Sequence, residues 1–238
     1  MEQAGIMAAK IAKMRRAAEQ RTEAMRLEPT GTTCQPAGMT SKYDQLEKHG
    51  IYRRFWNTSA GNIDRRGVPS DVRTQWQRVK AFIATLDAHI HRGEGLILAG
   101  GVGTMKTTMA IAVLRELVDQ KGQGYFIPMA SLLDTINGMR ERHDASLQAF
   151  EQKLRTTSLL VLDDLGAEYD HTWVQCKVDA IVNERYNRMR STIVTTNLSA
   201  QDIRDRYQLR IYDRLRATNQ LITFTGKSSQ SLRKTADF

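Results

Sequence analysis

GLILAGGVGTMKTTMA, residues 95–110, joins a short apolar run to a glycine-rich turn and then to a sequence suited to a helix. The residues at 96–99 are all apolar or small, which predicts a strand covered on both faces. Three glycines that let the backbone turn sharply follow at Gly100, Gly101 and Gly103. A helix beginning near Lys106 would offer unpaired backbone N–H groups, and the lysine adds a full positive charge. The stretch therefore predicts a cradle for phosphate groups.

This turn matches the P-loop pattern G-x-x-x-x-G-K-[ST] at every defined position except one. Gly100 opens the pattern and Lys106-Thr107 close it, but Met105 stands where the pattern has glycine. If the backbone at residue 105 needs a positive φ, methionine raises the free energy of that conformation by roughly 1–2 kcal/mol. We therefore expect weakened nucleotide binding. The predicted nucleotide-binding residues are Gly100, Gly101, Val102, Gly103, Thr104, Met105, Lys106, Thr107 and Thr108.

The overall composition is that of a basic globular protein. With 238 residues, of which 41% are hydrophobic, the chain is long enough for one buried core and an appendage. Its formal charge of +9 favours a polyanionic partner, although a basic protein without such a partner has the same composition. The two cysteines, Cys34 and Cys176, are too far apart to predict a disulfide framework or a Cys-rich zinc site. Because no apolar run approaches the roughly 20 residues that cross a bilayer, we expect a cytoplasmic protein without membrane contact.

Residues 1–45 are predicted to form an appendage made of an amphipathic helix and a linker. Apolar residues recur every three or four positions in the first 27 residues, and 28–41 are rich in Pro, Gly, Thr and Ser. A helix with so thin an apolar stripe is marginal alone, so we expect it to dock on a partner protein. Packing on its own domain and a frayed basic tail are the alternatives. The main domain is predicted to span residues 46–238.

Aromatic residues alternate with arginines just after this boundary. The residues concerned are Tyr52, Arg53, Arg54, Phe55, Trp56, Arg65 and Arg66. Such a mixture can stack nucleic-acid bases and bind phosphates, or it can cover a small core, and both interpretations stay open. Apolar residues at helical spacing then predict a single helix over 70–91.

Beyond the P-loop, strand patterns alternate with helix patterns. Strands are predicted at 125–129, 158–165, 191–196 and 221–225, with helices at 131–142, 145–154 and 173–189 and another beginning at Ser199. This alternation is typical of an α/β fold, in which helices cover both faces of a parallel sheet.

Two aspartates, Asp163 and Asp164, directly follow the apolar residues 159–162. Carboxylates at the C-terminal edge of a buried parallel strand face the crevice where such sheets bind ligands. A P-loop requires a carboxylate there to hold magnesium. Aspartates that merely form a turn are the alternative, and the upstream P-loop favours a magnesium site.

Taken together, four motifs resemble those of the AAA+ ATPases, specifically the DnaC-type helicase loaders and the IstB-type transposition helpers. The motifs are the P-loop at 100–107, LLVLDD at 159–164, TTN at 195–197 and RIYDRLR at 210–216. The resemblance covers about residues 50–235. It implies a P-loop AAA+ fold of the ASCE class, a three-layer αβα core whose parallel five-stranded sheet has the order 5-1-4-3-2.

The resemblance also implies a role for each matching residue. Lys106 would contact the β- and γ-phosphates of ATP or ADP, and Thr107 and Asp163 would hold Mg²⁺. Thr108 would assist at the phosphates, while Asp164 takes the position of a catalytic glutamate, so its shorter side chain would slow hydrolysis. Glu168 is implied as a substitute for that glutamate, and Asn197 as the sensor 1 residue. Arg214, or secondly Arg210, is implied as an arginine finger that acts in trans, and Arg233 as the cis sensor 2 arginine. Without the resemblance, these arginines indicate only a solvated basic face.

The function implied is that of an ATPase that loads a helicase during DNA replication. Such a protein assembles as a spiral or ring, binds single-stranded DNA and engages a DnaB-type helicase through its N-terminal region. An IstB-type helper that binds duplex DNA and recruits a transposase is the first alternative, and a nucleotide-binding adaptor with little hydrolysis is the second. The loader is favoured because residues 214–220, RLRATNQ, and 226–233, GKSSQSLR, differ from the IstB pattern. We expect a bacterial, phage or mobile-element gene.

Overall fold

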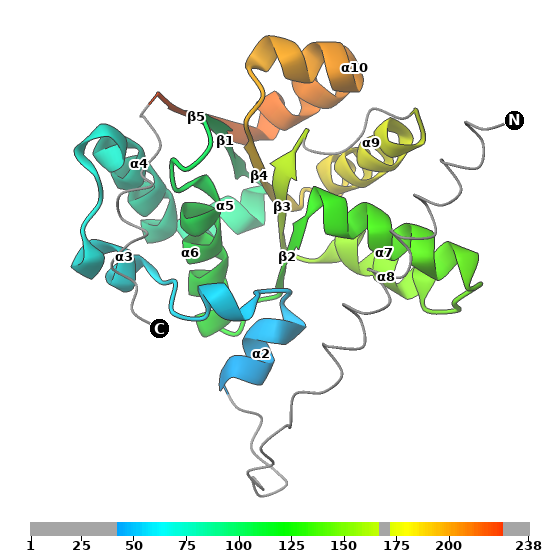
Figure 1. Cartoon of the computed structure of the whole chain (residues 1–238), viewed down its shortest axis with the longest axis horizontal. Coiled ribbons are helices and arrows are strands. Elements are labelled where there is room, and N and C mark those ends of the chain that lie inside the picture. The colour runs from blue at the N-terminus through cyan, green and yellow to red at the C-terminus, as the bar shows by residue number, and fades with distance from the viewer. Residues whose placement is uncertain (1–41, 167–171, 226–238) are drawn as a thin grey trace, which may run out of the picture. The chain divides into compact units, whose positions relative to one another are not determined.

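The computed structural model describes residues 42–166 and 172–225 (Figure 1). The predicted N-terminal helix and its linker at 28–41 lie outside these ranges, as do Glu168 and Arg233. The predictions for those segments, and the domain boundary after residue 45, stay predictions.

A five-stranded parallel sheet forms the centre of the fold (Figure 1). Its strands are β1 (Gly95–Gly100), β2 (Gly124–Pro128), β3 (Leu159–Leu165), β4 (Ser191–Thr196) and β5 (Asn219–Phe224). They lie in the order β2-β3-β4-β1-β5, which is the implied order 5-1-4-3-2 read from the opposite edge, so that prediction is confirmed. Strand β1, which leads into the P-loop, pairs with β4 on one side and with β5 on the other. Its carboxyl end therefore lies beside those of two other strands.

Helices cover both faces of the sheet and give the three predicted layers (Figure 1). One layer contains α2 (Lys42–Lys48), α3 (Ala60–Arg66), α4 (Arg73–Ala84), α5 (Leu86–Arg92) and α6 (Lys106–Asp119). The other contains α7 (Met129–Glu141), α8 (Leu147–Thr156), α9 (Thr172–Asn187) and α10 (Ala200–Thr218). No helix among these described residues is long and apolar enough to cross a membrane.

Alternate side chains of β1 enter the two cores. Leu96 and Leu98 pack in the cluster that contains α6, whereas Ile97 and Ala99 pack in the cluster that contains α10. All four side chains are buried. An apolar run without alternation is therefore required, because each face of this strand is covered by helices.

The prediction of a single helix over 70–91 is wrong in two places: the α-helix does not begin at Ser70, and it is interrupted at Thr85. The chain there forms a 3₁₀ turn, η2 (Ser70–Val72), followed by α4 and α5. Thr85 has φ −123° and ψ 31°, and its hydroxyl lies 3.4 Å from the carbonyl oxygen of Ala81. A threonine hydroxyl that bonds to nearby backbone competes with helical hydrogen bonds, which accounts for the break.

The aromatic residues before α3 cover the core. A 3₁₀ turn, η1 (Arg53–Phe55), places Phe55 and Trp56 against the buried cluster around α6. The indole N–H of Trp56 donates to the carbonyl of Ile51 at 3.2 Å. These contacts support the interpretation as a core cover, while the role in nucleic-acid binding stays a prediction.

Arg185 of α9 is fully buried and joins three elements. Its guanidinium donates to the carbonyls of Leu154 at 2.8 Å and Thr157 at 2.9 Å, at the end of α8, and to the carbonyl of Ser191. It also donates to the hydroxyl of Thr192 at 3.0 Å. Burial lowers the pKa of Arg185 to about 9, so the side chain is still charged at neutral pH. Among the described residues no carboxylate pairs with it, and backbone carbonyls provide most of its hydrogen bonds.

We predict that Arg185→Met lowers the free energy of unfolding by about 2–4 kcal/mol, because it leaves several buried acceptors without donors. Arg188→Met is the matched control, since Arg188 directly follows the same helix but is exposed and pairs with Glu184 on the surface. The control is expected to cost less than about 0.5 kcal/mol. Urea denaturation of the two variants measures both values, and equal losses would contradict the prediction.

Candidate nucleotide-binding site

The turn between β1 and α6 has the backbone conformations of a tight glycine loop. Gly100 has φ 150° and packs so closely on β5 that a Cβ atom would overlap the carbonyl of Phe224. Gly103 has φ 79°. A Cβ at Gly101 would meet open space, so glycine is not needed there for packing. The hydroxyl of Thr104 donates to the carbonyl of Gly101 at 2.8 Å and ties the loop together.

Met105 adopts φ 67° and ψ 13°, the left-handed conformation on which the expected cost depends. Helix α6 still begins at Lys106, and the amide of Met109 donates to the carbonyl of Met105 at 2.9 Å. The Met105 side chain is partly buried against the core cluster that contains α6. This packing offsets part of the backbone cost and accounts for a methionine at a position suited to glycine.

Lys106 extends from the start of α6 back across the loop. Its ammonium donates to the carbonyls of Gly100 and Gly101, both at 2.7 Å, and to Oδ1 of Asn197 at 2.9 Å. The residue is 5% exposed. Burial lowers the pKa of Lys106, and the carboxylates of Asp164 and Asp163 act in the opposite direction. The result is a concentrated positive charge beside the loop.

Asp163, at the end of β3, receives hydrogen bonds from two directions. The hydroxyl of Thr107 donates to its Oδ1 at 2.8 Å, and the hydroxyl of Thr195 donates to the same oxygen at 2.6 Å. The pKa of Asp163 is raised, because the effect of burial outweighs that of these two hydrogen bonds, which lower it. A buried carboxylate beside the first-turn threonine of α6 is an arrangement that suits a divalent cation.

Asp164 has the opposite environment from its neighbour. It is exposed, has φ 56°, and lies in a bulge where β3 shifts register against β4. Its backbone N–H donates to the hydroxyl of Thr195 at 2.9 Å. The two consecutive aspartates therefore point to different environments, one into the core and one toward solvent.

Asn197 follows β4 and joins the same cluster through its hydrogen bond to Lys106. The next turn is well defined, because the amide of Leu198 donates to the hydroxyl of Thr196 at 3.0 Å. Ser199 then caps α10, with reciprocal hydrogen bonds to Asp202. The structure thus brings together Lys106, Thr107, Asp163 and Asn197, from three separate parts of the chain.

The remaining predicted loop residues lie around this cluster. Val102 is 67% exposed at the tip of the loop, and Thr108 is half-buried in the first turn of α6.

Arg210 and Arg214, the predicted arginine fingers, lie on α10 and both bind Asp179 of α9. The distances are 2.6 Å from Arg210 Nη2 to Oδ2 and 3.2 Å from Arg214 Nη1 to Oδ1. The Arg210 side chain is 62% exposed and that of Arg214 is 21% exposed. Among the described residues, neither arginine hydrogen-bonds to the P-loop cluster.

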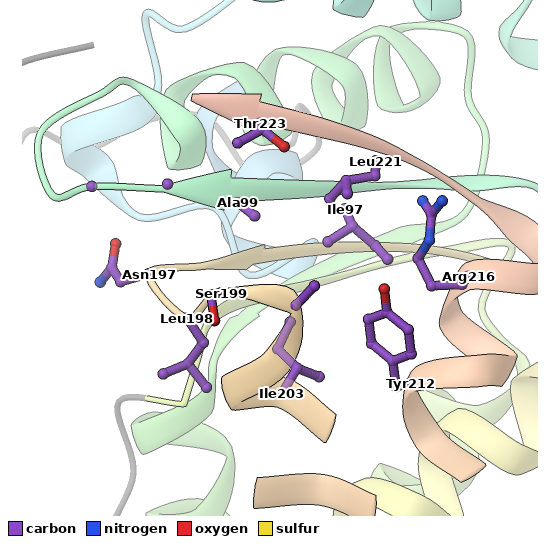
Figure 2. Close-up of a pocket in the computed structure, with 13 residues that line it drawn as sticks. Ile97, Ala99, Asn197, Leu198, Ser199, Ile203, Tyr212, Arg216, Leu221 and Thr223 are labelled. Carbon is purple, nitrogen blue, oxygen red and sulfur yellow. The ribbon is translucent and has the colours of Figure 1, made fainter. Parts of the chain in front are cut away.

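A pocket of about 300 Å³ lies beside the cluster, between the sheet and α10 (Figure 2). Figure 2 shows Asn197 at one end and Tyr212 with Arg216 at the other. The complete lining consists of Ile97, Ala99, Gly100, Gly101, Asn197, Leu198, Ser199, Ala200, Ile203, Tyr212, Arg216, Leu221 and Thr223. Its walls are mainly apolar, so it does not suit phosphate groups, but it shares Gly100, Gly101 and Asn197 with the cradle.

Sequence reasoning missed Thr195, which lies inside the quoted TTN motif, where only Asn197 is assigned a role. Thr104 is among the predicted nucleotide-binding residues, and its hydroxyl donates to the carbonyl of Gly101 within the loop. A threonine at the end of a predicted strand, two residues before the predicted sensor residue Asn197, is the signal that could have identified Thr195.

The donor set fits a nucleotide with a magnesium ion. A glycine loop, a helix N-terminus and a buried ammonium are suited to a chain of phosphates. Magnesium typically takes one or two protein ligands together with phosphates and water, as Thr107 and Asp163 would allow. No group of three or more His, Cys, Asp or Glu side chains that could hold a metal occurs in the part of the chain that the structure describes.

Comparison with known proteins agrees with this geometry. DnaI, the replicative helicase loader of Bacillus subtilis, is 26% identical over 133 residues, which are 56% of this chain and 42% of DnaI. The helicase loader DnaC of Escherichia coli is 23% identical over 155 residues, 65% of this chain and 62% of DnaC. An ATP-binding protein of insertion sequence IS21 from Pseudomonas aeruginosa is 30% identical over 115 residues, 48% and 42% of the two chains. The chain thus spans less than two thirds of each of these relatives.

Solved structures show the same fold. The crystal structure of the DnaC helicase loader superposes with a TM-score of 0.65 at 24% identity, and the match covers 73% of this chain and 100% of that one. The order of the strands and the three layers are therefore those of the AAA+ fold. The family model described as IstB-like ATP binding protein matches residues 71–235, which include every element from α4 to β5. The chain belongs to this family of IstB-like ATP-binding proteins.

Proposed function

We propose that this chain binds ATP with Mg²⁺ in the P-loop cradle and hydrolyses it. The observation that carries the proposal is the hydrogen-bonded cluster that joins Lys106, Thr107, Asp163 and Asn197. Such a cluster places a cation, a hydroxyl, a carboxylate and an amide around one loop, which are the groups used to position and neutralise transferring phosphates.

Each residue of the cradle has a specific role in this proposal. The Lys106 ammonium binds the β- and γ-phosphates, and Thr108 assists there. Thr107 and Asp163 hold Mg²⁺, which neutralises charge on the phosphates when it is bound. Asn197 already contacts Lys106, so its amide orients toward the same γ-phosphate region.

Hydrolysis also requires a group that orients the attacking water. Asp164 is the described candidate, because it is exposed next to Asp163 at the end of β3. An aspartate reaches less far than a glutamate by one methylene group, so turnover is expected to be slow. Glu168 remains the proposed substitute.

The arginines of α10 are proposed to act on the nucleotide of a neighbouring copy in a spiral or ring. Arg214 is the first candidate and Arg210 the second. Both arginines bind Asp179 of α9, and among the described residues neither hydrogen-bonds to the cradle of its own chain, which supports a role at another copy. A cation supplied in trans can gate phosphoryl transfer. Arg233 is proposed as the cis sensor 2 arginine.

The biological role proposed is that of a helicase loader in DNA replication. It would bind single-stranded DNA and deliver a DnaB-type helicase, with docking through the N-terminal region. The relatives DnaI and DnaC are helicase loaders, and the charge of +9 suits a nucleic-acid partner.

A transposition helper that binds duplex DNA and recruits a transposase is the second candidate. The IS21 relative and the IstB-like family model favour it. A nucleotide-binding adaptor with little hydrolysis is the third, favoured by Met105 in the loop and Asp164 in place of glutamate.

Replacing Lys106 by alanine tests nucleotide binding. We predict that Lys106→Ala lowers ATP affinity at least about tenfold, because a charge-assisted contact to phosphate is worth roughly 1.5–3 kcal/mol. Lys80→Ala is the control, since Lys80 lies on α4, outside the P-loop cluster, and its half-exposed ammonium pairs with Asp64. Titration with a fluorescent ATP analogue measures the affinities, and an unchanged affinity in Lys106→Ala would refute the proposed cradle.

Replacing Met105 by glycine tests the strained loop. Because glycine adopts φ 67° without a steric cost, we predict that Met105→Gly binds ATP about five- to tenfold more tightly, equivalent to roughly 1 kcal/mol. Met105→Ala is the matched control: it removes the long side chain but keeps the Cβ atom that makes a positive φ costly. Equal affinities in all three proteins would show that the loop tolerates methionine at no cost to binding.

The choice between loader and transposition helper is tested by DNA preference. In the presence of ATP, the full chain is expected to bind a single-stranded oligonucleotide at least about tenfold more tightly than the matching duplex, compared at one ionic strength of about 0.1 M. Fluorescence anisotropy measures both affinities. A preference for the duplex would reject the loader and support the helper.

A further inference from the structure

Thr195 occupies the position in β4 that lies opposite the bulge of β3. The register pairs Leu162 with Val194 and Leu165 with Thr196. Two residues of β3, Asp163 and Asp164, therefore face the single residue Thr195, which is the arrangement of a β-bulge. Thr195 itself is fully buried.

The hydroxyl of Thr195 binds both aspartates at once. It accepts a hydrogen bond from the Asp164 N–H at 2.9 Å, so its own proton is available for Asp163, whose Oδ1 lies at 2.6 Å. One bond fixes a side chain and the other fixes a backbone group. The hydroxyl thus compensates for the strand pairing that the bulge removes.

The two bonds have different consequences for the two carboxylates. Thr107 reaches Oδ1 of Asp163 from α6, while Thr195 reaches the same oxygen from β4, so the carboxylate is held from both sides. Asp164 has a positive φ of 56°, and the bond to its N–H stabilises that conformation. The positive φ at Asp164 directs its side chain away from the core. The side chain is therefore exposed to solvent.

We infer that Thr195 is a positioning residue for the proposed ATPase site. It orients Asp163 toward Mg²⁺ and holds Asp164 outward, where that carboxylate reaches the attacking water. This inference rests on the proposed function, and nothing in it requires Thr195 to touch the nucleotide. A buried threonine that served packing alone would be replaceable by valine, which has nearly the same shape.

Three variants separate positioning from packing. Thr195→Val removes only the hydroxyl, and Thr195→Ser restores it. Thr192→Val is the control for a lost buried hydroxyl, because Thr192 lies in the same strand but bonds to Arg185.

The first measurement needs no nucleotide. Hydrogen exchange of the Asp164 amide, followed by NMR in the full chain, is expected to accelerate at least about tenfold in Thr195→Val because the amide loses its acceptor. It should stay within about twofold of the unchanged protein in Thr195→Ser and Thr192→Val. No acceleration in Thr195→Val would overturn the inference.

The second measurement concerns the metal. Affinity for a fluorescent ADP analogue is determined with Mg²⁺ and with EDTA. Thr195→Val is expected to lose about 10–100-fold of the affinity in Mg²⁺, as is usual when a group that orients a metal ligand is removed, and to keep its affinity in EDTA. ATP turnover should fall by a similar factor. Equal losses in Mg²⁺ and EDTA, or the same losses in Thr192→Val, would indicate a packing role and overturn the inference.

These measurements also distinguish the inference from the function on which it rests. If the unchanged protein binds no nucleotide, the proposed function fails, and the amide exchange of Asp164 still decides whether Thr195 holds the bulge. If nucleotide binding and turnover are normal in Thr195→Val, the proposed function stands and the inference about Thr195 fails.

Discussion

The buried ammonium of Lys106 is the constraint on which the arrangement of the site depends. Removing a lysine charge from water costs several kcal/mol unless hydrogen bonds and opposite charges replace the solvent. Here the carbonyls of Gly100 and Gly101 and the side-chain Oδ1 of Asn197 accept hydrogen bonds from the ammonium, while Asp163 and Asp164 supply negative charge. These groups belong to β1, β3 and the end of β4. The carboxyl ends of the three strands must therefore meet at one point, which the parallel order of the sheet provides.

The same site contains two residues with unfavourable backbone conformations. Met105 and Asp164 both have a positive φ without being glycine. Each is stabilised by a different interaction: the Met105 side chain packs on the core, and the Asp164 N–H binds the hydroxyl of Thr195. Strained residues of this kind persist only when their surroundings fix them. Side-chain packing thus stabilises the positive φ of Met105, and the buried hydroxyl of Thr195 stabilises that of Asp164.

The sequence was sufficient to predict the sheet and the cradle, and insufficient for the contacts that fix their details. The residues before Gly100 and those before Asp163 are apolar because helices cover both faces of the sheet. The apolar pattern was therefore enough to predict where these two strands lie. The break at Thr85 depends on whether one hydroxyl turns to the backbone, which periodicity does not record. The bulge at Asp164, the pairing of Asp179 with two arginines and the network around Arg185 all join residues at least six positions apart. Long-range pairs of this kind have no signature in a single sequence.

Helix α10 connects the two halves of the proposed mechanism. Its first turn is fixed to the cradle, because Ser199 caps it two residues after Asn197, which binds Lys106. Its later turns carry Arg210 and Arg214, held by Asp179 of α9. A helix of 19 residues spans about 28 Å, so a displacement of Asn197 that α10 transmitted along its length would shift both arginines relative to α9. Because Asp179 binds both arginines, such a shift would weaken two ion pairs together. In the proposed assembly, the nucleotide bound to one copy would in this way control whether its Arg210 and Arg214 reach the nucleotide of the next copy.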